Sequence, residues 1–202
     1  MNSTDMKNVI LRLCDRIEEI RDELTDIDSK LGDGDMGISM SKGAQAVRAA
    51  VEGLESSDMK LLFLTSAQAL NKAAPSTMGT ILSSAILALA KYTAGKEALT
   101  EEEITAIPGV LTEAVMKRGK AQVGDKTILD AMVPYAQAVR TVYDQTKDLG
   151  QAKEMALTQA RAGMESTKGM IAKTGRASWL GERNKECPDG GAWMFCRAVE
   201  IL

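Results

Sequence analysis

Apolar residues recur every three or four positions along most of this chain. In the first such stretch, residues 5–28, charged residues occupy the other face, which predicts an amphipathic helix. Its apolar positions are Met6, Ile10, Leu13, Ile17, Ile20, Leu24 and Ile27. The same spacing predicts helices over 38–54, 58–73, 75–91, 101–119, from Asp125 or Thr127 through Val139, 150–171 and 192–202. No stretch alternates as a half-buried strand does, so we expect an all-α bundle of about eight helices.

Several of these helices carry residues that favour a helix start. Such signals stand at Ser57-Asp58, at Pro75-Ser76 and at the capping box Thr100–Glu103. Pro108 lies inside the fifth helix. Because proline has no backbone N–H to donate, we expect a break or a kink there, with helix resuming over 109–119.

The longest joints between helices are rich in Gly, Pro, Asp or Ser. They cover residues 28–37, 74–80, 119–127 and 173–191. In an up-and-down bundle every second joint falls at the same end, and these four share one end if Pro108 only kinks its helix. We therefore expect a ligand site at one end of a single domain that spans residues 1–202.

The first of these joints, Leu31-Gly32-Asp33-Gly34-Asp35-Met36-Gly37, concentrates acidic residues. With Asp28 just upstream it brings three carboxylates together, and each pair repels by roughly 1 kcal/mol even in water. Bound Mg²⁺, which prefers carboxylate oxygens, relieves that repulsion. Asp28 also falls near the C-terminus of its helix, where a negative charge is unfavourable. The trio therefore predicts a magnesium site, with an ordinary acidic turn as the alternative, since Asp-Gly pairs are common turn formers.

Two familiar motifs are excluded at this joint. Gly32-x-Gly34-x-x-Gly37 fits the dinucleotide-binding fingerprint, but that fingerprint follows a strand and holds a pyrophosphate on backbone N–H groups. Here a helical pattern precedes the glycines, and aspartates within the loop would repel a bare pyrophosphate. A calcium EF-hand is excluded because neither register supplies its acidic run with a Glu at position 12.

The other three joints contain residues that suit a phosphate site. Pro75-Ser76-Thr77-Met78-Gly79-Thr80 opens a helix, and free N–H groups at a helix N-terminus bind phosphate, although plain N-capping explains the same residues. Residues 118–127 carry four charges and two glycines, which fits either a pocket wall or a solvated connection. Residues 173–191 form the longest stretch without periodicity, of a kind that is usually functional or disordered. This stretch carries Arg176 and Arg183, and also Trp179, which we expect to anchor it in the core.

Composition narrows the classes of function. At 202 residues the chain is long enough to bury a core, and its 3% aromatic content favours helices built from Ala, Leu, Ile, Val and Met. The net charge of −3 without a basic run argues against a nucleic-acid partner. There is no histidine, which excludes Ser-His-Asp and Cys-His catalysis and phosphohistidine on this chain. A polar start, no long apolar run and three scattered cysteines predict a cytoplasmic protein with no membrane span.

Taken together, the four joints resemble the nucleotide-binding L subunit of dihydroxyacetone kinase, the DhaL family. The order and spacing of the matching pieces span nearly the whole chain. Those pieces are Asp28 with Leu31-Gly32-Asp33-Gly34-Asp35-x-Gly37, then Arg118-Gly119-Lys120-Ala121-x-Val123-Gly124-Asp125-Lys126-Thr127, and Arg176-Ala177-Ser178-x-Leu180-Gly181-Glu182-Arg183. The resemblance implies a closed up-and-down barrel of eight antiparallel helices with a nucleotide at one end.

The resemblance also implies roles for individual residues. Asp28, Asp33 and Asp35 would bind two Mg²⁺ ions that hold the phosphates of ADP or ATP. Arg176 would stabilise the transferring charge. The nucleotide contacts would be Met36, Gly37, Ile38, Ser39, Thr77, Met78, Gly79, Gly119, Ile128, Arg176, Asp189, Gly190 and Gly191.

In the bacterial branch that this resemblance favours, ADP is a tightly held cofactor. A phosphohistidine protein of the phosphotransferase system, the M-type partner, converts it to ATP. The ATP then phosphorylates dihydroxyacetone held by a separate K-type subunit. Because no K-type domain is joined to this chain, we expect that branch rather than a fused ATP-dependent kinase.

The chain departs from the family pattern at three positions. The family usually has His at Met36, Ser at Met78 and Pro at Gly190, and methionine cannot donate a hydrogen bond to phosphate. The metal ligands are kept, so these changes suggest a paralogue for another small ketose, such as a tetrulose, or one with weaker turnover. A nucleotide-binding regulatory or scaffold subunit stays open as the second hypothesis. The sequence does not reveal which ketose, which phosphate donor or which oligomeric state is used.

Overall fold

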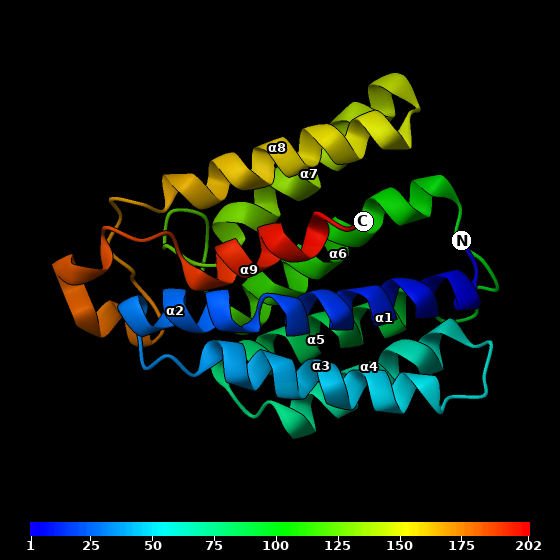
Figure 1. The fold of residues 1–202 in the computed structure, drawn as a ribbon. Helices are drawn as coiled ribbons and strands as arrows, with labels where there is room; N and C mark the ends of the chain where they lie inside the picture. Colours follow the sequence, from blue (N-terminus) through cyan, green and yellow to red (C-terminus); the bar gives the residue numbers. More distant parts are fainter.

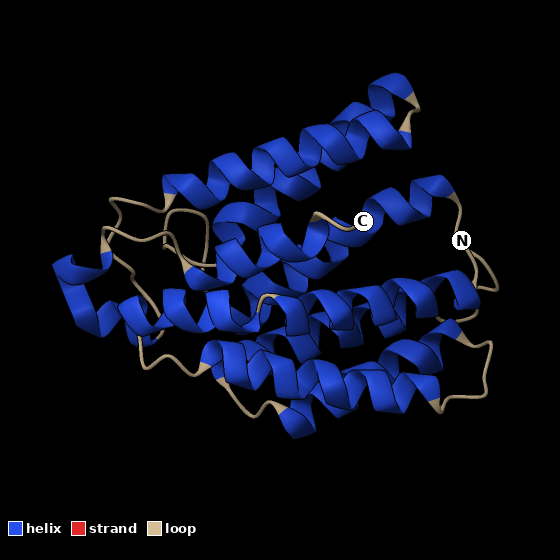
Figure 2. Cartoon of the chain, viewed as in Figure 1, coloured by secondary structure: helices blue, strands red, loops and turns tan.

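Helices form the whole framework of the protein (Figure 2). The computed structural model describes the backbone of residues 1–202 and every side chain except those of Arg183 and Asn184. The α-helices are α1 (Ser3–Glu19), α2 (Arg21–Leu31), α3 (Met36–Glu52), α4 (Met59–Ala73), α5 (Thr77–Tyr92), α6 (Glu101–Gly119), α7 (Leu129–Thr146), α8 (Leu149–Ser166) and α9 (Gly190–Val199), with a 3₁₀ segment η1 (Arg176–Asn184). In the described residues, β structure is limited to one isolated bridge between Asn2 and Ala98. The expected all-α class is confirmed.

The helices follow one another around the molecule. From α3 to α9 each helix packs against the next along the chain, and α9 also contacts α1 and α2, which returns the last helix to the first (Figure 1). This neighbour order is the one a closed barrel requires. The N-terminus lies at the end of the molecule opposite η1 (Figure 1), where its amino group donates to the carbonyl of Leu99.

The helix starts predicted from the sequence are confirmed at three places. Asp58 caps α4 by accepting the Lys60 N–H, and Ser76 caps α5 by accepting the Gly79 N–H. Thr100 and Glu103 form the complete capping box of α6. Each cap satisfies a backbone N–H that has no partner inside its own helix.

Two helix boundaries differ from the prediction. The expected helix over 5–28 is divided at Ile20, whose backbone (φ −88°, ψ 6°) leaves helical geometry between α1 and α2. Because Ile20 and Leu24 are both buried, the apolar periodicity continues across the division. The break considered at Pro108 is wrong, since α6 runs through it from Glu101 to Gly119. An internal proline removes one hydrogen bond of the helix, and here the rest of the helix is retained.

The second half of the chain brings four further corrections. The sixth predicted helix begins later, at Leu129, while α8 ends at Ser166 rather than near residue 171. The loop over 173–191 contains η1, which the sequence pattern did not indicate. Trp179, expected to be a core anchor, is 86% exposed on η1. The glycines on either side of it in the sequence, Gly175 and Gly181, both adopt positive φ.

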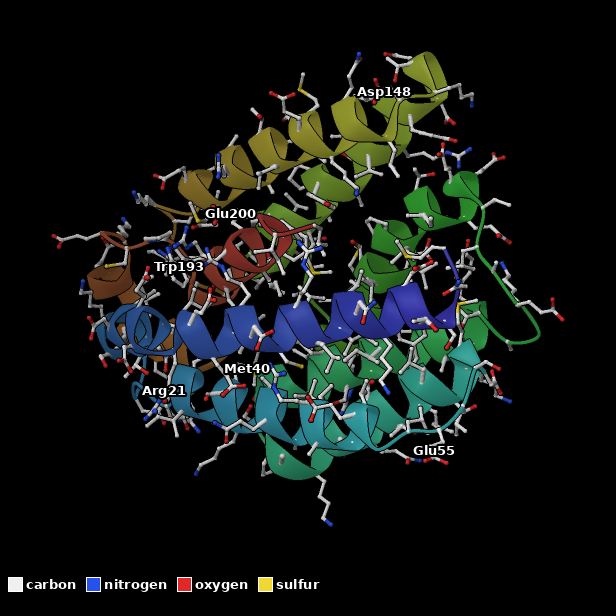
Figure 3. All side chains as sticks on the ribbon, turned by 45° about the vertical axis from the view of Figure 1, so that its right-hand side comes forward. Arg21, Met40, Glu55, Asp148, Trp193 and Glu200 are labelled. Atoms are coloured by element: carbon white, nitrogen blue, oxygen red, sulfur yellow. The ribbon has the colours of Figure 1, made fainter. Side chains whose placement is uncertain are left out.

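Packing explains how α7, α8 and α9 are held together. Ala152, Ala156 and Ala160 are fully buried at helical spacing along α8. A Cβ on Gly163 would lie 2.0 Å from the Asp130 carbonyl oxygen, which shows how closely α8 approaches α7. At the C-cap of α9, Glu200 (labelled in Figure 3) pairs with arginines of α1, α8 and α9: Arg16, Arg161 and Arg197. These contacts hold the end of α9 against both α1 and α8.

No helix in the described part of the chain is long and apolar enough to cross a membrane.

Candidate functional site

The three aspartates singled out in the sequence meet in space. Asp28, Asp33 and Asp35 each offer a carboxylate oxygen, and these oxygens all lie within 4.8 Å of one another. Asp28 is 8% exposed and its Oδ2 accepts the N–H of Met36 at 3.1 Å. This bond joins the last turn of α2 to the first turn of α3, so the loop between them is short and fixed. Asp28 therefore also has a structural function, because its carboxylate holds the start of α3 against the end of α2.

Asp35 occupies the N-cap position of α3 without acting as a cap. Among the described residues, no amide of α3 donates a capping hydrogen bond to its side chain. Its carboxylate instead lies 3.5 Å from the guanidinium of Arg176, which also contacts Asp33. The side chains of Asp33 and Asp35 are about half exposed, at 48% and 50%. The two accessible carboxylates therefore share one positive partner from η1, while the buried carboxylate of Asp28 accepts the Met36 N–H.

A cavity of about 490 Å³ opens beside these acids, a size typical of small-molecule sites. All four joints predicted to share one end of the bundle contribute to its lining. The N-terminal turns of α3, α5 and α9 contribute as well. Each of these turns presents N–H groups and the positive end of a helix dipole, which favour anions. The cavity thus combines a place for cations with helix ends that suit phosphate.

Most of the residues predicted for the site line this cavity. They are Asp28, Asp33, Asp35, Met36, Thr77, Met78, Gly119, Ile128, Arg176, Asp189, Gly190 and Gly191. The four predicted residues outside the lining are Gly37, Ile38, Ser39 and Gly79.

Two of these four have a clear packing function. A Cβ on Gly37 would lie 2.2 Å from the carbonyl oxygen of Arg21, and one on Gly79 would lie 2.0 Å from that of Ala74. These glycines let the first turns of α3 and α5 approach neighbouring backbone. Ser76 caps α5 as the plain N-capping alternative expects, and Ser76, Thr77 and Thr80 all line the cavity.

The three positions that depart from the family pattern are neighbours. A Cβ on Gly190 would contact the Met36 thioether at 3.5–3.6 Å, and one on Gly191 would approach the Met78 methyl group at 2.7 Å. The two methionines therefore fill space against the start of α9. This part of the wall is apolar and polarisable, without the hydrogen-bond donors that His or Ser would provide.

The loop that precedes α7 is built more firmly than its sequence indicated. Asp130, 2% exposed, accepts the N–H groups of Gly124 and Thr127 at 2.6 and 2.7 Å. Asp125 accepts the Gln122 N–H and the ammonium of Lys173. The Lys173 bond and the Gln122 bond lower the pKa of Asp125. This loop therefore forms part of the cavity wall, while Lys120, Gln122 and Val123 on its outer side are exposed, as a solvated connection would be.

The prediction missed one cavity residue of this loop in particular. Lys126 lines the cavity although it is only 2% exposed, and its Nζ donates to the Cys187 carbonyl at 2.8 Å. The signal was present, because Lys126 stands within the long motif that carries the family resemblance. A buried lysine cannot be recognised from sequence alone, since most lysines are exposed.

Asp189 begins the last helix at the edge of the cavity. Its carboxylate accepts the Ala192 N–H at 2.8 Å and so caps α9. Burial raises the pKa of Asp189 to about 6, and the nearby Asp130 adds to the effect, while the Ala192 N–H and the charge of Lys126 act against it. A carboxylate, a lysine and a helix N-terminus thus lie together where the nucleotide contacts were expected.

Fold and site together define a class of protein: an all-helical domain in which three clustered carboxylates and the N-termini of three helices border one cavity. Residues 30–202 match the DAK2 domain. The chain belongs to this family, which includes the DhaL subunits, and is a phosphotransferase-type protein.

Two relatives and one solved structure illustrate the likeness. The ADP-binding subunit DhaL of the PEP-dependent dihydroxyacetone kinase of Escherichia coli K12 is 29% identical over the whole chain and 96% of its own length. The ADP-binding subunit DhaL of the PTS-dependent dihydroxyacetone kinase of Lactococcus lactis is 32% identical over 93% of this chain and 92% of that protein. The dihydroxyacetone kinase of C. freundii in complex with AMP-PNP and Mg²⁺ has the same fold, with a TM-score of 0.73 and 17% identity over 99% of this chain and 33% of that chain.

Proposed function

We propose that this chain is the nucleotide-binding subunit of a dihydroxyacetone-kinase-type complex and relays a phosphoryl group through a magnesium-bound nucleotide. The observation that carries the proposal is the cavity in which Asp28, Asp33 and Asp35 cluster, with Arg176 paired to the last two, beside the N-termini of α3, α5 and α9. Both of the relatives described above are named as ADP-binding subunits, which supports ADP as the nucleotide.

The carboxylate trio fits magnesium. Mg²⁺ is a hard cation that binds few protein carboxylates and shares its remaining positions with water and substrate phosphates. Three oxygens within 4.8 Å, two of them on accessible side chains, meet that requirement. We propose that Asp28, Asp33 and Asp35 hold two such ions, whose charge would neutralise phosphate oxygens of the bound nucleotide.

The remaining walls orient the nucleotide. Thr77 and Thr80 place hydroxyl groups at the start of α5, and the first turn of α9 places Gly190 and Gly191 opposite Met36 and Met78. Arg176 directly follows Gly175, which adopts a positive φ, and its guanidinium lies at the edge of the acidic trio. We propose that its guanidinium stabilises the charge on the transferred phosphoryl group, as preorganised cations do in phosphoryl transfer.

Partners supply the rest of the reaction. This chain has no histidine, so a phosphohistidine donor must be on another protein, which we propose to be an M-type protein of the phosphotransferase system. The phosphoryl group passes from that histidine to the β-phosphate of ADP, forming ATP. The γ-phosphoryl group of ATP then passes to a hydroxyl group of a small ketose on a K-type subunit, leaving ADP in place. We expect this to occur in the cytoplasm.

Binding of ADP tests the proposal directly. Thermal unfolding should shift upward with ADP only when Mg²⁺ is present, and Asp33→Ala should abolish the shift. Asp22→Ala is the matched control, because Asp22 is a fully accessible acid on α2, with its side chain 97% exposed. An upward shift that is independent of Mg²⁺, or that survives in Asp33→Ala, would reject the proposed site.

A nucleotide-binding scaffold with reduced turnover is the second candidate. It is favoured by the apolar contacts of Met36 with the start of α9, because they replace donors that would position phosphate. Phosphoryl transfer to dihydroxyacetone and to a tetrulose should be measured with K-type and M-type partners present. Tight ADP binding without transfer to either sugar would support the scaffold, and transfer at ordinary kinase rates would eliminate it.

A further inference from the structure

Lys126 is held in a conformation and an environment that are both unfavourable for lysine. Its backbone has φ +58°, in the left-handed region that side chains with a Cβ rarely adopt. Its side chain is the largest of the fully buried ones in the described part of the chain. Burial of an ammonium group costs free energy, and here it lowers the pKa of Lys126. A residue that combines these costs persists only where surrounding contacts fix it, and such residues cluster at functional sites.

Those contacts come from two distant parts of the sequence. On one side, Asp130 binds the Gly124 and Thr127 amides and so fixes the backbone before and after Lys126. On the other side, the Nζ of Lys126 reaches the carbonyl of Cys187, 61 residues later. The negative charge of Asp189, which caps α9, stabilises the ammonium form.

The lysine therefore joins two walls of one cavity. Its own loop leads to Ile128 and the start of α7, and the turn it holds leads to Gly190 and the start of α9. Both walls line the cavity that Lys126 also lines. We propose that Lys126 is a positioning residue for the nucleotide: its ammonium group holds the 187–189 turn against the loop before α7, so that the two walls face the nucleotide at a fixed separation. This inference rests on the proposed function, because a bound nucleotide is what the two walls would grip.

Glycine and methionine substitutions separate this function from that of a simple turn residue. Lys126→Gly removes the left-handed backbone cost together with the ammonium group, whereas Lys126→Met keeps the side-chain bulk without the donor. Lys120 is the matched control, since it is also a left-handed lysine (φ +51°) of the same loop, but it is exposed at the end of α6. If Lys126 only formed the turn, glycine would be neutral or favourable at both positions.

The affinity for ADP should be measured by calorimetry at saturating Mg²⁺, with hydrogen exchange of the amides of 187–192 as a second readout. We expect Lys126→Gly and Lys126→Met to weaken ADP binding by about tenfold or more, the effect of losing a hydrogen bond from a charged donor. Exchange of the 187–192 amides should accelerate in both. Lys120→Gly should leave both readouts unchanged, and Lys126→Arg, which retains a cationic donor, should restore most of the affinity.

The possible failures can be told apart. A wild-type chain that binds ADP, together with a folded Lys126→Met chain that binds it equally well, would overturn this inference alone. A wild-type chain that binds no ADP would overturn the proposed function and this inference with it. If Lys126→Met does not fold, the Lys126→Arg chain decides, because loss of ADP binding in a folded arginine variant would contradict a function carried by the positive donor.

Discussion

Replacing Arg176 by glutamine should strengthen the binding of Mg²⁺ to the nucleotide-free protein. The guanidinium of Arg176 contacts Asp33 and lies 3.5 Å from the Oδ2 of Asp35. A metal ion and this guanidinium are both attracted to the same two carboxylates, so they compete. Arg176→Gln removes the competitor while keeping a polar side chain of similar length.

The structure sets the size of the effect. The side chains of Arg176, Asp33 and Asp35 are 57%, 48% and 50% exposed, so solvent screens both ion pairs. Accessible pairs of this kind contribute about 0.2–1 kcal/mol each. Their combined loss, about 0.4–2 kcal/mol, corresponds to roughly two- to thirtyfold tighter metal binding. Because accessible charges are screened by salt, the difference should shrink as ionic strength rises.

Calorimetric titration with Mg²⁺, without nucleotide, measures this affinity. Arg118→Gln is the control, because Arg118 lines the same cavity from α6 and the change in net charge is identical. With ADP present the order should reverse, since Arg176 then contributes to phosphate binding. Equal or weaker Mg²⁺ binding by nucleotide-free Arg176→Gln would refute the competition.

Three further predictions follow from burial and packing. Asp28→Asn should abolish the Mg²⁺-dependent stabilisation by ADP. It should change the unfolding temperature of the free protein little, because an asparagine oxygen can still accept the Met36 N–H. If the stabilisation by ADP persists in this variant, Asp28 is not a magnesium ligand. Gly163→Ala should destabilise the protein by about 1–3 kcal/mol or more, because the added Cβ would lie 2.0 Å from a backbone oxygen. The control Gly109→Ala, in open space within α6, should stabilise the protein by about 0.5–1 kcal/mol. Equal changes in the free energy of denaturant unfolding for the two variants would contradict this packing. The pKa of Asp189 is raised from 3.8 to about 6 in the folded protein, so the folded state binds the proton more tightly than the unfolded state. The stability of the wild-type protein should therefore fall by about 3 kcal/mol in all as pH rises from about 4 to about 6. Asp189→Asn keeps a capping oxygen and should lack this fall, and a stability that changes with pH in parallel for the two chains would refute the assignment.

The helical class and the ends of several helices were predictable because they depend on local signals. Apolar spacing and cap residues act within a few positions, so Asp58, Ser76 and Thr100 were identified correctly as helix starts. The division at Ile20 was missed because apolar periodicity reports the buried face of a helix and carries no information on whether its backbone continues. The exposure of Trp179 was missed because aromatic residues are buried on average, and because the sequence pattern did not indicate the 3₁₀ segment that carries it.

The candidate site was predictable to a similar degree and for a different reason. Carboxylates close in sequence must be close in space, so the trio with Asp33 and Asp35 was recognisable in advance. The contact of Lys126 with Cys187 crosses 61 residues and depends on how the loops before α7 and α9 pack together. Long-range pairings of this kind follow from the tertiary structure and leave no periodic signal in the sequence.

The outward position of Trp179 has a practical consequence for spectroscopy. The chain contains two tryptophans, and the other, Trp193, lies on α9 with the Arg197 guanidinium 5.7 Å from its ring centre (Figure 3 labels Trp193). A Trp193→Phe chain would therefore carry a single indole fluorophore, three residues from Arg176 and open to water. The emission wavelength of Trp179 and its quenching by iodide would then report whether η1 loses contact with solvent, for example when a ligand or partner binds, without an added dye.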